Sequence, residues 1–180
     1  LTINEILTGT GGYALSLLNG ATLEADTNFT NTGNLTIGNA AGEAYAFNGG
    51  LSTGARAAGT LFVAGDLTTN SRQMDFGNTT ITATTSLDSG ADPLNIQSVS
   101  ASGQQLRLQS TGTSTGTVTI QDASTIGTLT TFGGGYDIAF NASTGGGGTA
   151  TTIETGTTFL NTGEVSFGNE TTDSFSLTAG

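Results

Sequence analysis

The sequence predicts an all-β fold: a right-handed parallel β-helix (β-solenoid) with about 20–22 residues per coil that takes up residues 1–180 as a single segment. Three observations predict the solenoid. The chain contains a long internal repeat, its apolar residues alternate along short segments, and its composition is rich in Gly and poor in charge.

Residues 21–50 are repeated as residues 151–180, at an offset of 130. Ten of the thirty positions are identical, including Phe29 with Phe159 and Asn31-Thr-Gly with Asn161-Thr-Gly. A fixed long period is typical of repeat architectures. A shorter echo, an apolar residue followed by Gly-Asn, begins at Ile37, Phe76 and Phe167, with spacings of 39 and 91. At the predicted coil length the shorter spacing makes two coils and the long offset makes six, so Phe29 and Phe159 are expected at equivalent places on different levels of the coil.

Apolar residues recur in pairs separated by one residue, which is the period of a strand with one buried side. The pairs are Leu1/Ile3, Leu15/Leu17, Leu35/Ile37, Tyr45/Phe47, Leu61/Val63, Leu94/Ile96, Leu106/Leu108, Val118/Ile120, Ile138/Phe140, Val165/Phe167 and Phe175/Leu177. From Leu94 to Val118 the spacing is a regular 12, with turn formers such as Ser102-Gly103 between the pairs. No segment keeps a helical period, so no helix is predicted.

The composition suits a coil that turns sharp corners and stacks equivalent residues of successive coils on one another. Gly accounts for 29 of 180 residues, and Gly and Asn accept positive φ at corners. Charged residues are only 9%, as expected where like charges would otherwise stack at strand spacing. The single Pro, Pro93, follows Asp92 in a predicted turn.

The charge balance excludes several classes of partner and chemistry. A net charge of −11, with Arg56, Arg72 and Arg107 as the only basic side chains, argues against binding to nucleic acid. No apolar run reaches the roughly 18 residues of a membrane span, so no membrane insertion is predicted. The absence of Cys and His excludes the usual zinc sites and nucleophilic triads. The chain starts at Leu1 without a Met or a signal segment, so we expect a mature or excised piece of a longer protein.

The run from Thr158 to Gly180, with Gly134-Gly-Tyr-Asp-Ile-Ala-Phe140 ahead of it, resembles the repeats of very large secreted bacterial β-strand-repeat proteins, which are similar to filamentous-haemagglutinin-like adhesins. The likeness spans most of the chain. It implies an extracellular, right-handed parallel β-helix that serves as fibre, stalk or adhesin. Calcium-binding Gly-Gly-x-Gly-x-Asp nonapeptides are absent, so that subclass is not implied.

Paired carboxylates are the one route to catalysis that the composition leaves open, because two acids at suitable separation can cleave glycans. The local candidates are Glu24/Asp26, which would share a strand face, and Glu170/Asp173. Glu154 repeats Glu24, but Gly156 replaces Asp26, so the pair is lost in the second copy. Solvated acids on the strand face are the favoured interpretation.

The remaining polar candidates also favour structural roles. Asp88 and Asp92 flank a short turn, yet calcium needs six to eight oxygens, which favours surface turn acids. A sugar-stacking platform would use Tyr13, Tyr45 or Tyr136, but Tyr45 repeats as Phe175 in an apolar pair, which favours the core.

Two further sequence features concern loops. Glycosylation sequons occur at Asn28, Asn34, Asn78, Asn141 and Asn169, several of them expected by chance in so Asn- and Thr-rich a chain. The run Gly145 to Gly148 lacks the Lys-Ser/Thr of a phosphate loop and is interpreted as a looped-out insertion of the second repeat and a candidate contact site.

The sequence therefore predicts a non-catalytic structural and interaction module of an extracellular or cell-surface filament, stalk or giant adhesin, with no catalytic, cofactor-binding or metal residue assigned. Open strand edges at residues 1–7 and 175–180 are expected to continue into further repeats or to dock end to end on copies of the chain, and surface glycans are a further partner class. Two alternatives stay open: a pilin-like β-sandwich that donates residues 1–7 to a neighbour, and a polysaccharide-acting β-helix.

Overall fold

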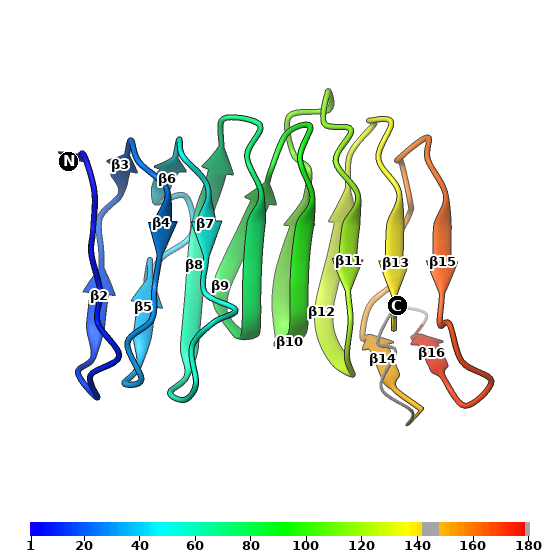
Figure 1. Ribbon diagram of the computed structural model, residues 1–180. Coiled ribbons are helices and arrows are strands. Elements are labelled where there is room, and N and C mark those ends of the chain that lie inside the picture. Colours follow the sequence, from blue (N-terminus) through cyan, green and yellow to red (C-terminus); the bar gives the residue numbers. More distant parts are fainter. Residues whose placement is uncertain (142–147, 179–180) are drawn as a thin grey trace.

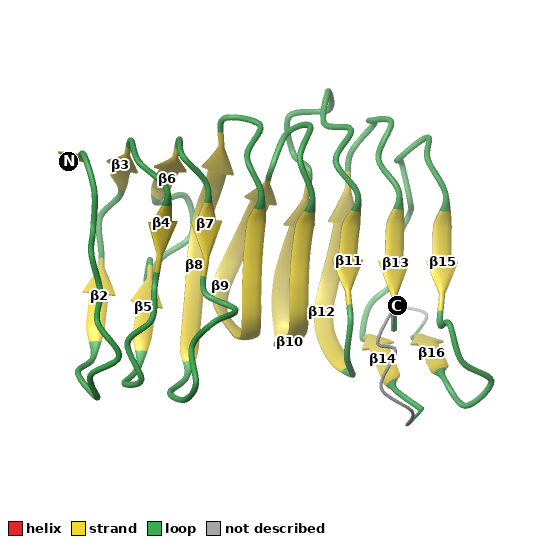
Figure 2. Cartoon of the chain, viewed as in Figure 1, coloured by secondary structure: helices red, strands yellow, loops and turns green. Residues whose placement is uncertain are grey.

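The fold is a β-solenoid of about seven turns. The structure is a computed structural model that describes residues 1–141 and 148–178. In these residues every regular element is a strand and every strand pairing is parallel (Figure 1, Figure 2). The predicted all-β solenoid is confirmed. The β-sandwich alternative is wrong, because it requires antiparallel pairing between two layers.

Each coil has three sides, which we call faces 1, 2 and 3 in the order in which the chain runs through them. Face 1 comprises β4 (Thr27–Asn28), β7 (Leu51–Ser52), the starts of β9 (Met74–Asp88) and β10 (Leu94–Leu108), β11 (Val118–Ile120), β13 (Ile138–Phe140) and β15 (Val165–Phe167). Face 2 comprises β2 (Leu15–Leu17), β5 (Leu35–Ile37), the start of β8 (Leu61–Thr69), the middles of β9 and β10, the start of β12 (Ser124–Thr131), β14 (Ala150–Ile153) and β16 (Ser174–Leu177). Face 3 comprises β1 (Thr2–Ile3), β3 (Ala21–Leu23), β6 (Ala44–Phe47) and the ends of β8, β9, β10 and β12.

The length of a coil varies around the predicted value. Along face 3, five steps carry the chain from Ala21 to Thr131, so the average step agrees with the prediction. The step from Leu61 to Thr79 is shorter than this average, and the step from Ser124 to Thr151 is longer. The corners absorb the variation, because the strands must stay in register while the loops between them need not.

The two copies of the sequence repeat do not lie on the same face. Ala21 is on face 3, whereas its counterpart Thr151 pairs with Ser124 on face 2. The repeat offset is thus five coils and two faces, and the expectation of six whole coils is wrong. Phe29 and Phe159 consequently follow strands of different faces, and their expected equivalence along the coil fails.

Each copy nevertheless forms one closed coil with the same internal register. Ala21 lies opposite Tyr45, and Thr151 lies opposite Phe175, so the coil closes after the same length of chain in both copies. The repeat therefore encodes a coil and not a position around the rod. The shorter echo fails in the same way, since Ile37 is on face 2 and Phe76 on face 1.

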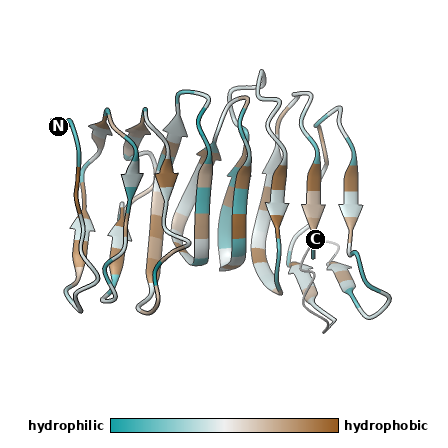
Figure 3. Cartoon of the chain, viewed as in Figure 1, coloured by the Kyte–Doolittle hydropathy of each residue, from teal (hydrophilic) through white to brown (hydrophobic). Residues whose placement is uncertain are grey.

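Except for Leu1, Phe167 and Leu177, the paired apolar residues belong to one continuous column inside the coils or pack against it. Figure 3 shows hydrophobic positions, coloured brown, along the strands of successive coils. The largest fully buried side chains include Phe29, Phe47, Phe76, Phe140, Tyr45 and Tyr136. Cohesion is axial, because the strands of each coil, as far as the structure describes them, pair with strands of the coil before it and the coil after it.

Glycine lets the chain turn where coils approach closely. Gly65, at the corner between faces 2 and 3 in β8, has φ +90°. A Cβ there would lie 2.4 Å from the carbonyl oxygen of Glu43 in the preceding coil. Only glycine satisfies both the dihedral and the contact.

Candidate functional site: the two open ends of the solenoid

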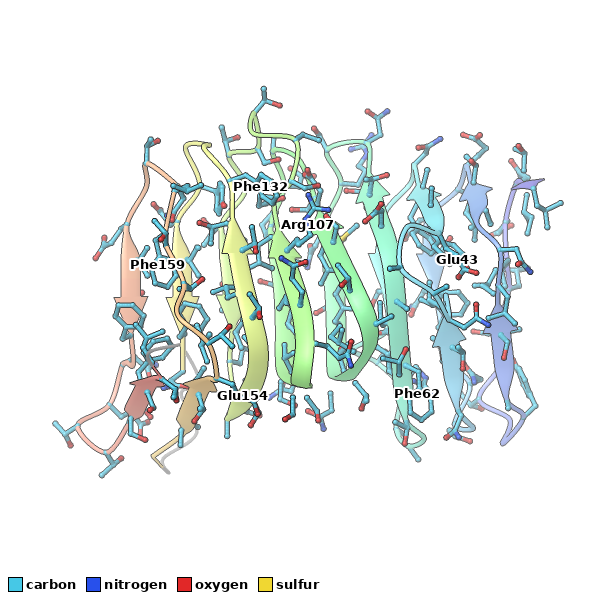
Figure 4. The ribbon with its side chains drawn as sticks, turned by 180° about the vertical axis from the view of Figure 1, so that it is seen from behind. Glu43, Phe62, Arg107, Phe132, Glu154 and Phe159 are labelled. Atoms are coloured by element: carbon cyan, nitrogen blue, oxygen red, sulfur yellow. The ribbon has the colours of Figure 1, made fainter. Side chains whose placement is uncertain are left out.

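The C-terminal end of the apolar column is a cluster of phenylalanine rings. Phe140 and Phe167 stack with ring centroids 5.8 Å apart and an interplanar angle of 7°, and Phe175 lies 4.3 Å from Phe167. Phe140 is buried, whereas 47% of Phe167 is exposed. Phe159 meets Phe140 edge to face at 6.3 Å and is labelled near this end in Figure 4. The column thus ends in aromatic surface open to solvent.

The N-terminal end exposes apolar surface as well. Leu1 is 86% and Leu7 84% exposed, and Tyr13 is 44% exposed. The Tyr13 hydroxyl donates to the Gly9 carbonyl at 3.2 Å and accepts from the Gly9 N–H at 2.9 Å, so this ring folds back on its own coil.

Exposed large apolar side chains concentrate at these two ends. Within the part of the chain that the structure describes, they are Leu1, Leu7, Tyr13, Leu18, Leu160, Phe167 and Leu177. All belong to the first or the last coil. In the interior coils most large apolar side chains are buried, and the described Phe62 and Phe132 are half-buried.

Unpaired strand edges accompany this apolar surface. Among residues 1–141 and 148–178, β1 pairs only with β3 and β2 only with β5 at one end. At the other end β15 pairs only with β13 and β16 only with β14, as far as the described residues go. Each end therefore offers backbone N–H and C=O groups to a further parallel strand.

The repeated asparagine of the Asn-Thr-Gly corner makes the same hydrogen bonds in both copies. Asn31 Nδ2 donates to the Tyr13 carbonyl, and Asn161 Nδ2 donates to the Tyr136 carbonyl, both at 3.1 Å. Gly33 ends the Asn-Thr-Gly corner that begins at Asn31. A Cβ on Gly33 would lie 2.4 Å from the Tyr13 carbonyl oxygen, which explains why this corner carries a glycine. These shared residues hold neighbouring coils together.

In each copy of the repeat, a carboxylate organises the loop that begins with Gly-Asn, residues 38–43 in the first copy and 168–173 in the second. Glu43 accepts from the Asn39 N–H at 2.9 Å, and Asp173 accepts from the Asn169 N–H at 2.9 Å. Asp173 also accepts from the Thr149 N–H at 2.8 Å on the neighbouring coil. The Asn39 N–H is the main cause that lowers the pKa of Glu43, and the Thr149 N–H is the main cause that lowers the pKa of Asp173. Both acids are ionised turn-organising groups, so the Glu170/Asp173 pair has one member already engaged by the backbone.

The other acid pair is at a corner. Glu24 and Asp26 lie between β3 and β4, and not on a shared strand face as expected. Glu24 accepts from Asn48 Nδ2 at 2.7 Å. Its repeat counterpart Glu154 instead accepts from the Ser102 hydroxyl at 2.5 Å and the Gly103 N–H at 2.8 Å, and Ser102 is the main cause that lowers the pKa of Glu154 (Figure 4).

Asp88 corrects the expectation of a surface turn acid. Its side chain is 2% exposed and accepts from the Gly90 N–H, the Thr111 N–H and the Ser114 hydroxyl, at 2.7 to 2.9 Å. These three hydrogen bonds connect the loop after β9 to the loop after β10. No cluster of three potential metal ligands occurs among residues 1–141 and 148–178.

The tyrosines differ in role. Tyr45 is buried in the column, as expected, and Tyr136 is buried there too. Each hydroxyl donates to a backbone carbonyl of an earlier coil, that of Tyr45 to Leu17 at 3.0 Å and that of Tyr136 to Leu108 at 3.3 Å. Aromatic rings that do face outward, Phe62 and Phe132, did not stand out from the sequence, because both sit in strand-like segments (Figure 4). Arg107 lies over the Phe132 ring at 5.1 Å.

Among the sequons, Asn141 is excluded as an acceptor in the folded chain. It is fully buried, its Nδ2 donates to the Ser174 carbonyl at 2.9 Å, and its Oδ1 accepts from Thr151 at 2.6 Å. The other four sequon asparagines are exposed: Asn28, Asn34, Asn78 and Asn169. Most of the Gly145 to Gly148 run lies outside the described residues.

Comparison with protein-family models, with curated proteins and with solved structures finds no match for this chain. None of the described residues belongs to a helix with the length and hydrophobicity of a membrane span. The fold and its two ends define the class: a β-solenoid repeat protein.

Proposed function

We propose that this chain is a non-catalytic structural module that stacks end to end on further solenoid coils, as part of an extracellular or cell-surface bacterial filament, stalk or adhesin. The observation that carries the proposal is the position of the exposed apolar side chains, which lie on the first and last coils. The extracellular setting draws on the resemblance to secreted β-strand-repeat proteins.

Stacking would be head to tail. The two ends differ in chemistry, since one presents Leu1 and Leu7 and the other presents Phe167 and its aromatic neighbours. A head-to-tail contact that leaves both outer ends free repeats without closing and builds a rod. The added coil would extend the parallel ladders and bury the Phe167 ring.

Sedimentation velocity over a range of concentrations tests this proposal. The unmodified chain is expected to form linear oligomers that grow with concentration and appear as rods by negative-stain electron microscopy. Leu7→Asp and Phe167→Asp place a charge at opposite ends, and each is expected to be monomeric. Ser166→Asp, on the same strand as Phe167, is the matched control and is expected to oligomerise like the unmodified chain.

Mixing the two monomeric variants distinguishes head-to-tail from symmetric contacts. Each variant keeps one intact end, so a one-to-one mixture is expected to form heterodimers and nothing longer. A symmetric tail-to-tail contact would instead leave Leu7→Asp dimeric by itself. A chain that stays monomeric at every concentration would overturn the proposal.

A further inference from the structure

A polar hollow of about 260 Å³ lies where face 1 turns into face 2. One wall is the loop between β7 and β8, which carries Arg56, and the floor is the same corner in the next coils, with Gly77, Gln97 and Gln121. A smaller hollow of about 130 Å³ shares Arg56 and Gly77 and continues under the loop. The two form one notch.

The notch exists because the corner changes length from one coil to the next. The whole segment 53–60 separates Ser52 from Leu61, whereas Gly77 alone separates the face 1 and face 2 parts of β9. The long loop therefore overhangs a short corner. The hydrophobic pattern of the sequence does not require this difference in corner length.

Arg56 is a fixed donor in the wall. Its Nε donates to the Asn31 carbonyl at 3.1 Å and its Nη2 to the Gly33 carbonyl, both on the preceding coil. Burial lowers its pKa, but an arginine remains cationic at neutral pH. The guanidinium is thus held in one orientation at little further entropic cost on binding.

The floor presents both donors and acceptors. Gln97 donates through Nε2 to Asp122, and Asn78 accepts from the Ser98 hydroxyl at 2.8 Å, so both side chains are positioned. The half-buried Gln121 carboxamide makes no hydrogen bond to a described residue. Gln97 and Gln121 stand on successive coils, about 4.8 Å apart at the backbone.

The chemistry of the lining selects the ligand class. Arg56 is balanced by Asp75 in the same hollow, and the chain carries a net charge of −11, which disfavours anions. Phe76 contributes no apolar floor, because its side chain is 1% exposed. Hydroxyl groups donate and accept at once and match carboxamides, a carboxylate and a guanidinium. We propose that the notch binds an uncharged sugar ring of a glycan.

Gly77 leaves room for this ligand without being required by the fold. It is not among the glycines with positive φ, and a Cβ would meet its nearest heavy atom, the Thr53 carbonyl oxygen, at an ordinary 3.5 Å. A side chain here is therefore compatible with folding and would fill the notch. The substitution Gly77→Gln separates loss of binding from loss of structure.

Saturation-transfer NMR with the methyl glycosides of glucose, galactose, mannose and N-acetylglucosamine tests the inference, on the Leu7→Asp chain so that end stacking plays no part. We expect transfer to at least one glycoside, and binding weaker by about tenfold or more in Gly77→Gln and in Gln121→Ala. Gln105→Ala removes a carboxamide on face 3 and is expected to bind like the parent chain.

Absence of transfer to every one of these glycosides would overturn the inference, and so would transfer that Gly77→Gln leaves unchanged. Stronger transfer to sialic acid methyl glycoside than to all four uncharged sugars would contradict the charge argument. The inference is independent of end-to-end stacking, so either can fail while the other stands.

Discussion

At the residue scale, a few polar side chains connect coils that the apolar column alone would leave free to shift. Glu154 is the clearest case. It reaches Ser102 and Gly103 two coils away. Gly127 lies on the coil between them, and a Cβ there would lie 2.5 Å from the Gln104 nitrogen. That corner of the intervening coil therefore requires glycine.

Glu154→Gln is expected to lower the urea midpoint of unfolding near neutral pH and to lower it less near pH 3. The hydrogen bonds from Ser102 and Gly103 lower the pKa of Glu154 in the folded chain. Its stabilisation is therefore complete above the unfolded-state pKa of roughly 4.3 and disappears as the pH falls through the folded value.

Glu24→Gln is the matched control, because Glu24 accepts from the Asn48 side chain and glutamine keeps an acceptor there. We expect a smaller change in its midpoint. Equal effects of Glu154→Gln at both pH values would show that charge is not the cause.

At the element scale, corners decide how strands become coils, and glycines with similar sequence surroundings differ sharply in what they tolerate. Gly65 combines φ +90° with a close backbone contact, whereas Gly77 has neither. In the sequence both appear simply as a glycine within a strand-like segment.

Gly65→Ala is expected to destabilise the chain by about 1–3 kcal/mol, because the new Cβ is strained and meets the Glu43 carbonyl. Gly77→Ala is expected to be neutral or to stabilise by up to about 1 kcal/mol, by restricting the unfolded chain. Urea titration followed by circular dichroism measures both. A similar loss for the two variants would contradict the assignment of the corners.

At the scale of the whole molecule, stability is a sum over neighbouring coils. The central coils, built from β8, β9 and β10, have a packed neighbour on both sides, and the end coils have one. Apolar burial follows the same trend, from complete at Phe76 to half-exposed at Phe167.

Hydrogen exchange is therefore expected to be slowest in β9 and β10 and to become faster toward β1 and β2 and toward β15 and β16. Mass spectrometry of the Phe167→Asp variant, kept monomeric, measures this gradient. Protection that is uniform along the chain would mean a single cooperative unit and would contradict axial cohesion. In the unmodified chain, stacking should raise protection at the end coils.

The amino-acid sequence by itself determined the strands that carry paired apolar residues and the inward side of most of them, and it favoured their winding into a solenoid. Period-2 alternation fixes which side chains are buried, as for Leu35 and Ile37, and glycine-rich corners permit the turns. The repeat also encodes one coil of fixed length, because the contacts that close a coil are made between its own first and last strands.

Only the tertiary structure decided which face each strand occupies. Face position depends on the sum of all preceding corner lengths, so variable loops such as 53–60 shift Thr151 from the expected face 3 to face 2. The burial of Asp88 and the notch beside Arg56 also depend on how coils stack. Each involves contacts between corners of neighbouring coils that are far apart in sequence. Neither feature can therefore be predicted from the sequence of one corner alone.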